Sequence, residues 1–170
     1  MAKVHGKGGH GRYFRELERA RQHQEEMKAK IARAQEAKVR QMTDAAKREV
    51  EAIGEKFTQE VIPMLKQVRI KIEERARRGG IAPHAFVLRT LAIDEYAVRE
   101  IKRRMTENEV IKPFADEINF DDYRPLSWTE RSQLLQFAIG KKPSISKQRT
   151  TLAEIQRLSY EVPRWAVGTI

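Results

Sequence analysis

Three pairs of adjacent carboxylic acids are the residues of this sequence whose type and spacing come closest to catalytic chemistry. Neighbouring acids can share acid–base work or hold a divalent cation. The pairs are Asp94 with Glu95, Asp116 with Glu117, and Asp121 with Asp122. None has a histidine close by, and the chain contains no phosphate-binding glycine loop, nucleophile elbow or HExxH zinc motif. We therefore expect no enzymatic activity. The acids should lie in a solvated loop or contact basic segments of another copy of the chain.

Metal binding has equally little support in the sequence. The chain has no cysteine, which excludes disulfides, thiolate metal sites and cysteine nucleophiles. His5 and His10 lie in a glycine-rich, basic segment, residues 1–11, which we expect to be a flexible tail. Such a tail cannot hold ligands in fixed positions, so we expect neither a metal nor another cofactor.

Basic side chains carry the strongest chemical signal. The formal net charge is +10, which favours anionic partners such as nucleic acid. Two groups are candidates for nucleic-acid binding. They are Arg69, Lys71, Arg75, Arg77 and Arg78, and Lys141, Lys142, Lys147 and Arg149. The alternatives are cations that compensate the dipole at a helix C-terminus for the first group, and a solvated loop for the second.

Charge is distributed unevenly along the chain. Residues 1–80 hold 20 Lys and Arg and 12 Asp and Glu, residues 81–140 hold 8 and 10, and residues 141–170 hold 6 and 2. A nearly neutral middle thus separates two basic segments. This pattern predicts a packed middle and partner-binding ends, and it would favour an electrostatic contact between copies that weakens as salt rises.

A long charged helix over residues 12–78 must position the first basic group. Residues 12–53 lack Gly and Pro and are rich in strong helix formers. Apolar residues recur at steps of three and four, as a helix stripe requires. The partner-helix seam is Phe14, Leu17, Met27, Ile31, Met42 and Val50. This seam is thin, so the helix should act as a coiled-coil-like arm that needs a partner. Gly54 and Pro63 predict a kink near residues 54–63.

After Gly54 the helix carries larger apolar residues that should pack onto the rest of the protein. These are Phe57, Val61, Met64, Leu65, Val68 and Ile72. Gly79 and Gly80 should end the helix.

Residues 81–162 read as a small domain of shorter helices. Pro83 begins one, and the pairs Thr106–Glu109, Ser127–Glu130 and Thr151–Glu154 have capping-box spacing. Trp128, at a helix start, should lie in the core. Residues 163–170 should form an irregular tail, with Trp165 as an anchor that docks it.

The expected fold is therefore all-α, with a long kinked N-terminal helix and a small C-terminal helical bundle. No apolar run is long enough to span a bilayer, and no secretory signal is recognisable. The expected function is non-enzymatic: a structural or assembly protein of a large complex, of the phage virion or packaging type, in the cytoplasm or within a particle. It would form homo-oligomers or be a subunit, near nucleic acid. The alternatives are a DNA- or RNA-binding regulator that dimerises through the long helix, and an adaptor for a cellular protein.

Overall fold

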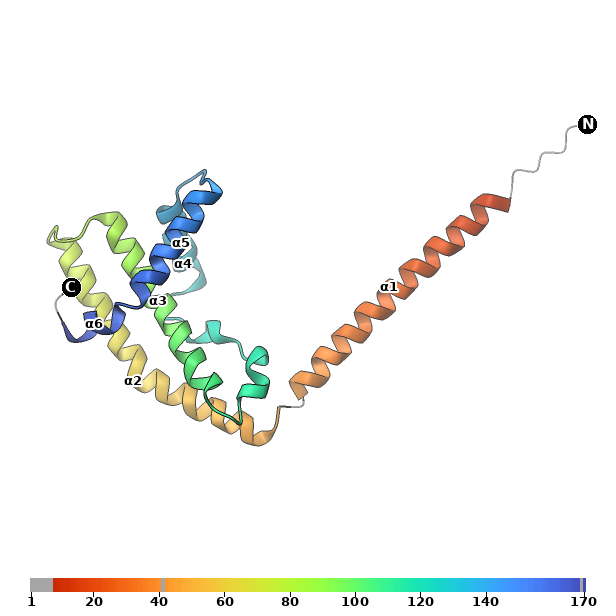
Figure 1. Ribbon diagram of the computed structural model, residues 1–170, viewed down its shortest axis with the longest axis horizontal. Coiled ribbons are helices and arrows are strands. Elements are labelled where there is room, and N and C mark those ends of the chain that lie inside the picture. Colours follow the sequence, from red (N-terminus) through yellow and green to blue (C-terminus); the bar gives the residue numbers. More distant parts are fainter. Residues whose placement is uncertain (1–7, 41, 169) are drawn as a thin grey trace, which may run out of the picture. The chain divides into compact units, whose positions relative to one another are not determined.

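The computed structural model describes residues 8–40, 42–168 and 170, and every regular element among them is helical (Figure 1). The chain divides into two compact units, residues 1–43 and 44–170. The first unit contains α1 (Gly8–Arg40). The second contains α2 (Asp44–Arg77), α3 (Pro83–Thr106), the 3₁₀ helices η1 (Lys112–Glu117) and η2 (Phe120–Tyr123), α4 (Trp128–Ile139), α5 (Ile145–Ser159) and α6 (Val162–Val167). The expected all-α fold is confirmed.

The predicted single helix over residues 12–78 consists of two helices. It is interrupted at Met42 and Thr43, which are not helical. Thr43 is a residue type that favours the position before a helix's first turn, and Asp44 brings an acid to the positive end of the α2 dipole. The expected long N-terminal helix is thus only partly confirmed.

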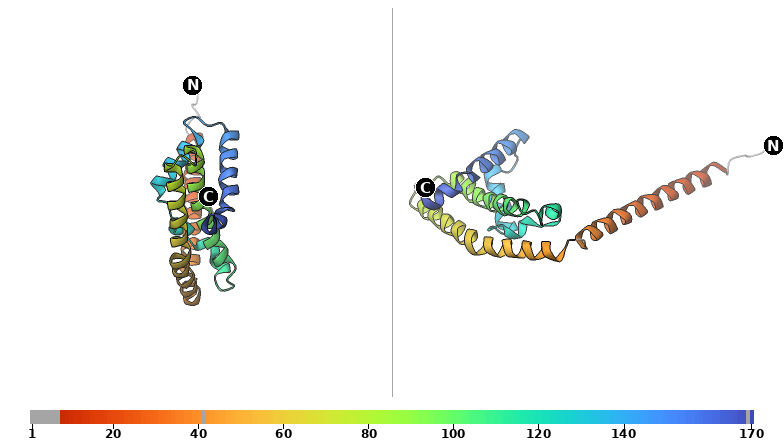
Figure 2. Two further views of the ribbon diagram at one scale, coloured as in Figure 1. Left: turned by 90° about the vertical axis from the view of Figure 1, so that its left-hand side faces the viewer. Right: turned by 60° about the horizontal axis from the view of Figure 1, so that its bottom comes forward.

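The kink expected near residues 54–63 does not break α2, which continues through both Gly54 and Pro63. Figure 2 shows α2 as one curved, unbroken ribbon. Gly54 is buried and faces Tyr123: a Cβ built at Gly54 would lie 2.6 Å from the Tyr123 hydroxyl oxygen. Glycine at position 54 therefore allows α2 and the Tyr123 segment to approach closely. Pro63 lies on the exposed side of the helix.

The core of the second unit lies around α3, which packs against every other helical element of that unit. Phe57, Leu65 and Ile72 of α2 are fully buried, as are Ile101 and Met105 of α3. The prediction that α2 packs onto the rest of the protein after Gly54 is confirmed. Each fully buried aliphatic or aromatic side chain of this kind contributes about 1.5–3 kcal/mol.

Helix ends agree with some of the sequence signals and not with others. Ser127 and Glu130 form the predicted capping box of α4, and Pro83 begins α3. Thr106 opens no helix, because it is the last residue of α3 and its hydroxyl donates to the Lys102 carbonyl at 2.8 Å. Thr151 lies within α5, which Ser144 caps instead.

Both ends of the chain are more regular than predicted. Helix α1 begins at Gly8, so the flexible-tail prediction is wrong for residues 8–11, while residues 1–7, with His5, lie outside the described part. The predicted irregular tail over residues 163–170 contains most of α6, in which Pro163 occupies the first turn. Trp128 is 74% exposed, which contradicts its predicted place in the core.

Candidate functional site

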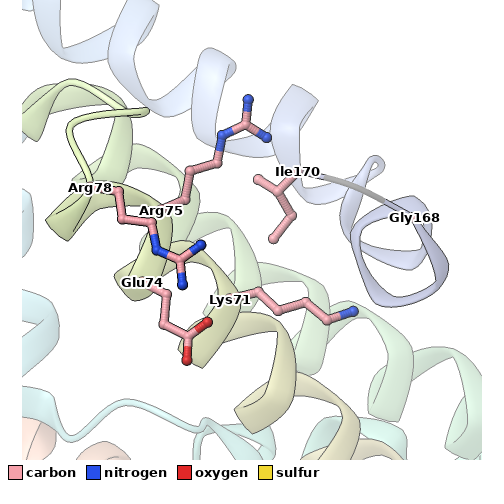
Figure 3. A pocket seen from close by; sticks show the side chains of 6 residues that line it. All are labelled: Lys71, Glu74, Arg75, Arg78, Gly168 and Ile170. Carbon is pink, nitrogen blue, oxygen red and sulfur yellow. The ribbon is translucent and has the colours of Figure 1, made fainter.

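The C-terminal end of α2 presents a basic pocket. Lys71, Arg75 and Arg78 are separated by steps of four and three, which places them on one side of α2 and of the turn that follows it, and Glu74 lies next to Arg75. Together with Gly168 and Ile170 they line a cavity of about 450 Å³, which we call the basic pocket (Figure 3). Three cationic side chains and one acidic side chain therefore line one open cavity.

Two glycines shape the helix end that carries the pocket. Gly79 has a φ of +76°, a left-handed conformation that ends α2. The Gly80 amide donates to the Arg75 carbonyl at 2.9 Å. A Cβ on Gly80 would lie 2.9 Å from Cγ of Arg75, so a larger residue would displace that side chain. The predicted helix stop at Gly79 and Gly80 therefore also holds Arg75 at the pocket.

The opposite wall of the pocket is the segment that follows α6. Trp165 is 6% exposed and lies within the core of the second unit, with the Arg89 guanidinium 6.0 Å from its ring centroid. Helix α6 packs against α2, and Lys71 Nζ donates to the Ala166 carbonyl at 3.2 Å. The structure therefore docks the C-terminal segment through Trp165 onto its own chain.

The structure separates the five cations of the first basic group. Arg69 is paired with Glu73 at 3.2 Å and with Glu130 at 3.6 Å, and it does not line the pocket. Arg75, Arg77 and Arg78 are exposed, and none of them has an ion pair among the described residues. Arg77 lies outside the pocket lining. The pocket thus has two arginines that remain available to an added anion.

The second basic group lies on the loop between α4 and α5 and on the first turns of α5. Lys141, Lys142, Lys147 and Arg149 are all exposed, and none of them lines the basic pocket. Gly140, with a φ of +91°, ends α4, and the Ser144 hydroxyl accepts from the Lys147 amide at 3.1 Å. Lys141 and Lys142 therefore lie on the loop, and Lys147 and Arg149 lie at the capped N-terminal end of α5.

The predicted partner-helix seam is divided between the two units. Phe14, Leu17, Met27 and Ile31 lie on α1 and are between 37% and 62% exposed. Met42 lies between the helices and is half-buried, and Val50 packs against the core of the second unit. Only the first four therefore remain a candidate surface for a partner.

Sequence analysis missed Tyr13, which belongs to the same surface of α1. It is 62% exposed and lies edge-on to Phe14, with ring centroids 6.1 Å apart. Tyr13, Leu17, Ala20, Gln24, Met27 and Ile31 alternate steps of four and three, as the a and d positions of a heptad do. This heptad spacing is the sequence feature from which Tyr13 could have been predicted as part of the surface.

Two of the three acid pairs lie around one arginine. The Nη1 atom of Arg124 is 2.5 Å from a carboxylate oxygen of Asp94, and its Nε is 2.7 Å from Asp121. These residues line a cavity of about 340 Å³ together with Glu95, Arg131 and four aliphatic side chains. Asp94 is 2% exposed, and burial raises its pKa despite the guanidinium beside it. The carboxylates are engaged by arginines, so the arrangement connects the η2 segment to α3.

Comparisons with protein-family models, with curated proteins and with solved structures find no match for this chain. Among the described residues, no helix combines the length and apolar character that crossing a lipid bilayer demands. The same residues contain no group of three histidine, aspartate or glutamate side chains placed to hold a metal ion.

Proposed function

We propose that this chain is a non-enzymatic assembly protein of a large complex, of the phage virion or packaging type. It associates with further copies through α1 and keeps its basic segments near nucleic acid. The observation that carries this proposal is the apolar stripe on α1, whose side chains are exposed along a helix of 33 residues.

The length and composition of α1 support a partner-binding role. A helix of 33 residues is about 50 Å long, and isolated helices gain little stability from propensity alone. Tyr13, Phe14, Leu17, Met27 and Ile31 are each exposed by more than a third. Covering them in a helical partner would contribute roughly 1 kcal/mol each, because about half of each side chain is already shielded. Pairing with a second copy supplies that cover.

The decisive measurement is the mass of the full chain in solution, by light scattering or sedimentation, at low and high salt. We expect defined oligomers for the natural sequence. Leu17→Glu with Ile31→Glu places two charges in the stripe and should yield monomers. Gln22→Glu with Ala29→Glu adds the same charge on the opposite face of α1 and should leave the oligomer intact. A monomeric natural chain at both salt concentrations would remove self-association through α1.

A DNA- or RNA-binding regulator is the second candidate. Arg75, Arg77 and Arg78, which have no ion pair within the described part of the chain, favour it. A regulator should bind duplex or single strands tightly on its own, with affinity that falls steeply as salt rises. An assembly protein should form oligomers and bind nucleic acid weakly. An adaptor for a cellular protein should do neither without that protein.

A further inference from the structure

We infer that the basic pocket at the end of α2 binds a phosphate group of a nucleic-acid strand. This assigns the nucleic-acid contact of the proposed function to Lys71, Arg75 and Arg78, and it rests on that part of the proposal. It does not depend on pairing through α1.

The chemistry of the lining suits phosphate. The guanidinium group offers a planar fork of donors that matches phosphate oxygens, and Lys adds a compact cation. Lys71, Arg75 and Arg78 lie on one side of α2 and of the turn that follows it, and Glu74 is the single acidic side chain among the lining residues. The cationic side chains of the lining therefore outnumber the acidic ones.

The length of the site favours a strand over a single phosphate. Arg78 directly follows α2, and its amide still donates to the Glu74 carbonyl at 3.1 Å, as in a further helical turn. The seven residues from Lys71 to Arg78 therefore correspond to about 10 Å along the helix axis. Successive phosphates of one strand of B-form DNA rise by about 3.4 Å. A row of three cations of this length can therefore contact neighbouring phosphates of one backbone.

Several arginines of the second unit are paired with carboxylates, whereas Arg75 and Arg78 have no ion pair among the described residues. Arg103 is paired with Glu100 and Glu107, at 2.7 and 2.8 Å. Arg157 is paired with Glu154 and Glu161, at 2.6 and 2.8 Å. Arg69, two turns before the end of the same helix, is also paired.

Arg75 and Arg78 lie three residues apart with no carboxylate partner among the described residues. Like charges so close together weaken a helix slightly. An external anion would relieve that repulsion. Arg77, also exposed and unpaired, adds positive potential beside the pocket and favours a polyanion.

The test measures binding of a fluorescent 20-nucleotide single strand and of the matching duplex to the full chain by anisotropy, at several salt concentrations. Arg75→Gln with Arg78→Gln removes two charges from the pocket. Lys56→Gln with Lys66→Gln removes two charges from exposed positions of the same helix outside the pocket. Thermal melting checks that both variants fold, and light scattering of the same samples reports the oligomer independently.

We expect the pocket variant to bind at least tenfold more weakly and the control variant at most threefold. The slope of log affinity against log salt should fall by about 1.4 for the single strand or about 1.8 for the duplex in the pocket variant. Equal losses in the two variants would show that net charge alone acts, and no binding by the natural chain at 50 mM salt would equally overturn the inference.

Competition identifies the source of the anion. If inorganic phosphate or a mononucleotide displaces the strand at an equal concentration of phosphate groups, the pocket binds free phosphate. That result would contradict binding of a nucleic-acid strand. A polyglutamate peptide that binds as tightly, and loses affinity in the same variant, would assign it to an acidic protein. If oligomers form but strands do not bind, this inference fails and assembly through α1 stands.

Discussion

Arg124 donates to the buried carboxylate of Asp94, thirty positions earlier in the chain. Asp94 is 2% exposed and the Arg124 side chain is 17% exposed, so both charges have left most of their water. The Leu126 amide also donates to Asp94, at 3.4 Å. This arrangement attaches the segment between η2 and α4 to the central helix α3.

Removing Arg124 should therefore destabilise the second unit strongly. In Arg124→Met the Asp94 carboxylate would be buried without its cation, which costs about 3–5 kcal/mol. Asp121→Asn removes a 63% exposed partner of Arg124 and should cost far less, because water screens an exposed ion pair. Urea unfolding of both variants measures the difference. Similar midpoints for the two would show that the buried pair contributes no more than the exposed one.

Gly54 should tolerate a side chain only when Tyr123 is shortened. In Gly54→Ala the new Cβ meets the Tyr123 ring, whose edge also contacts Phe57, and the overpacking should cost about 1–3 kcal/mol. In a Tyr123→Ala background the same change should stabilise by up to about 1 kcal/mol, because alanine favours helix. A double-mutant cycle of unfolding free energies measures the coupling, and additive effects would contradict the close approach.

The two tryptophans should differ sharply in their effect on stability. Trp165→Ala removes a buried ring against which α6 is held and should cost about 3–5 kcal/mol. Trp128→Ala, at a 74% exposed position, should change stability by no more than about 0.5 kcal/mol. Thermal melting compares them, and the fluorescence that remains in each variant shows whether the surviving tryptophan is shielded from water. A large loss for Trp128→Ala in this measurement would indicate that α4 packs differently.

Acid should weaken the cluster of charges at the end of α3. Hydrogen bonds from Arg103 and Arg104 hold the pKa of Glu100 below its ordinary value. The ionised form of Glu100 is thus favoured in the folded state. The stability that this carboxylate adds to the fold is therefore present above pH 4.5 and is lost as pH falls through the folded pKa.

Glu100→Gln should cost about 1 kcal/mol at neutral pH, and the difference from the natural chain should shrink in acid. Unfolding curves between pH 3 and pH 7 measure it. Glu154→Gln removes a more exposed carboxylate, paired with Arg157, and is the matched control with a smaller effect at neutral pH. A difference for Glu100→Gln that stays constant with pH would contradict the role of its ionised form.

Helix ends were predictable where a local signal decides them. The capping box of Ser127 and Glu130, the start at Pro83 and the stop at Gly79 follow from side-chain and backbone preferences within a few residues. Gly54 shows the limit of such reasoning. A glycine inside a helix pattern suggests a break, whereas here Tyr123, far along the chain, requires the space.

The candidate site was predictable as a cluster but not as a pocket. The spacing of Lys71, Arg75 and Arg78 on one helix face follows from the sequence. That Arg69 is paired with Glu130 while Arg75 faces the segment with Ile170 depends on tertiary contacts. Asp94 was recognised as an acid of interest, yet nothing local indicates that Arg124 is its partner.

The docking of α6 onto α2 has a consequence for how the protein is made on the ribosome. The Lys71 side chain reaches the Ala166 carbonyl across 95 positions, and Val162 and Trp165 are buried in the same core. During vectorial synthesis α2 emerges with its apolar face uncovered on that side, and it stays so until residues 162–167 have left the exit tunnel. Closure of this unit is thus a late event, and until then the uncovered face of α2 is exposed to chaperones and to premature association.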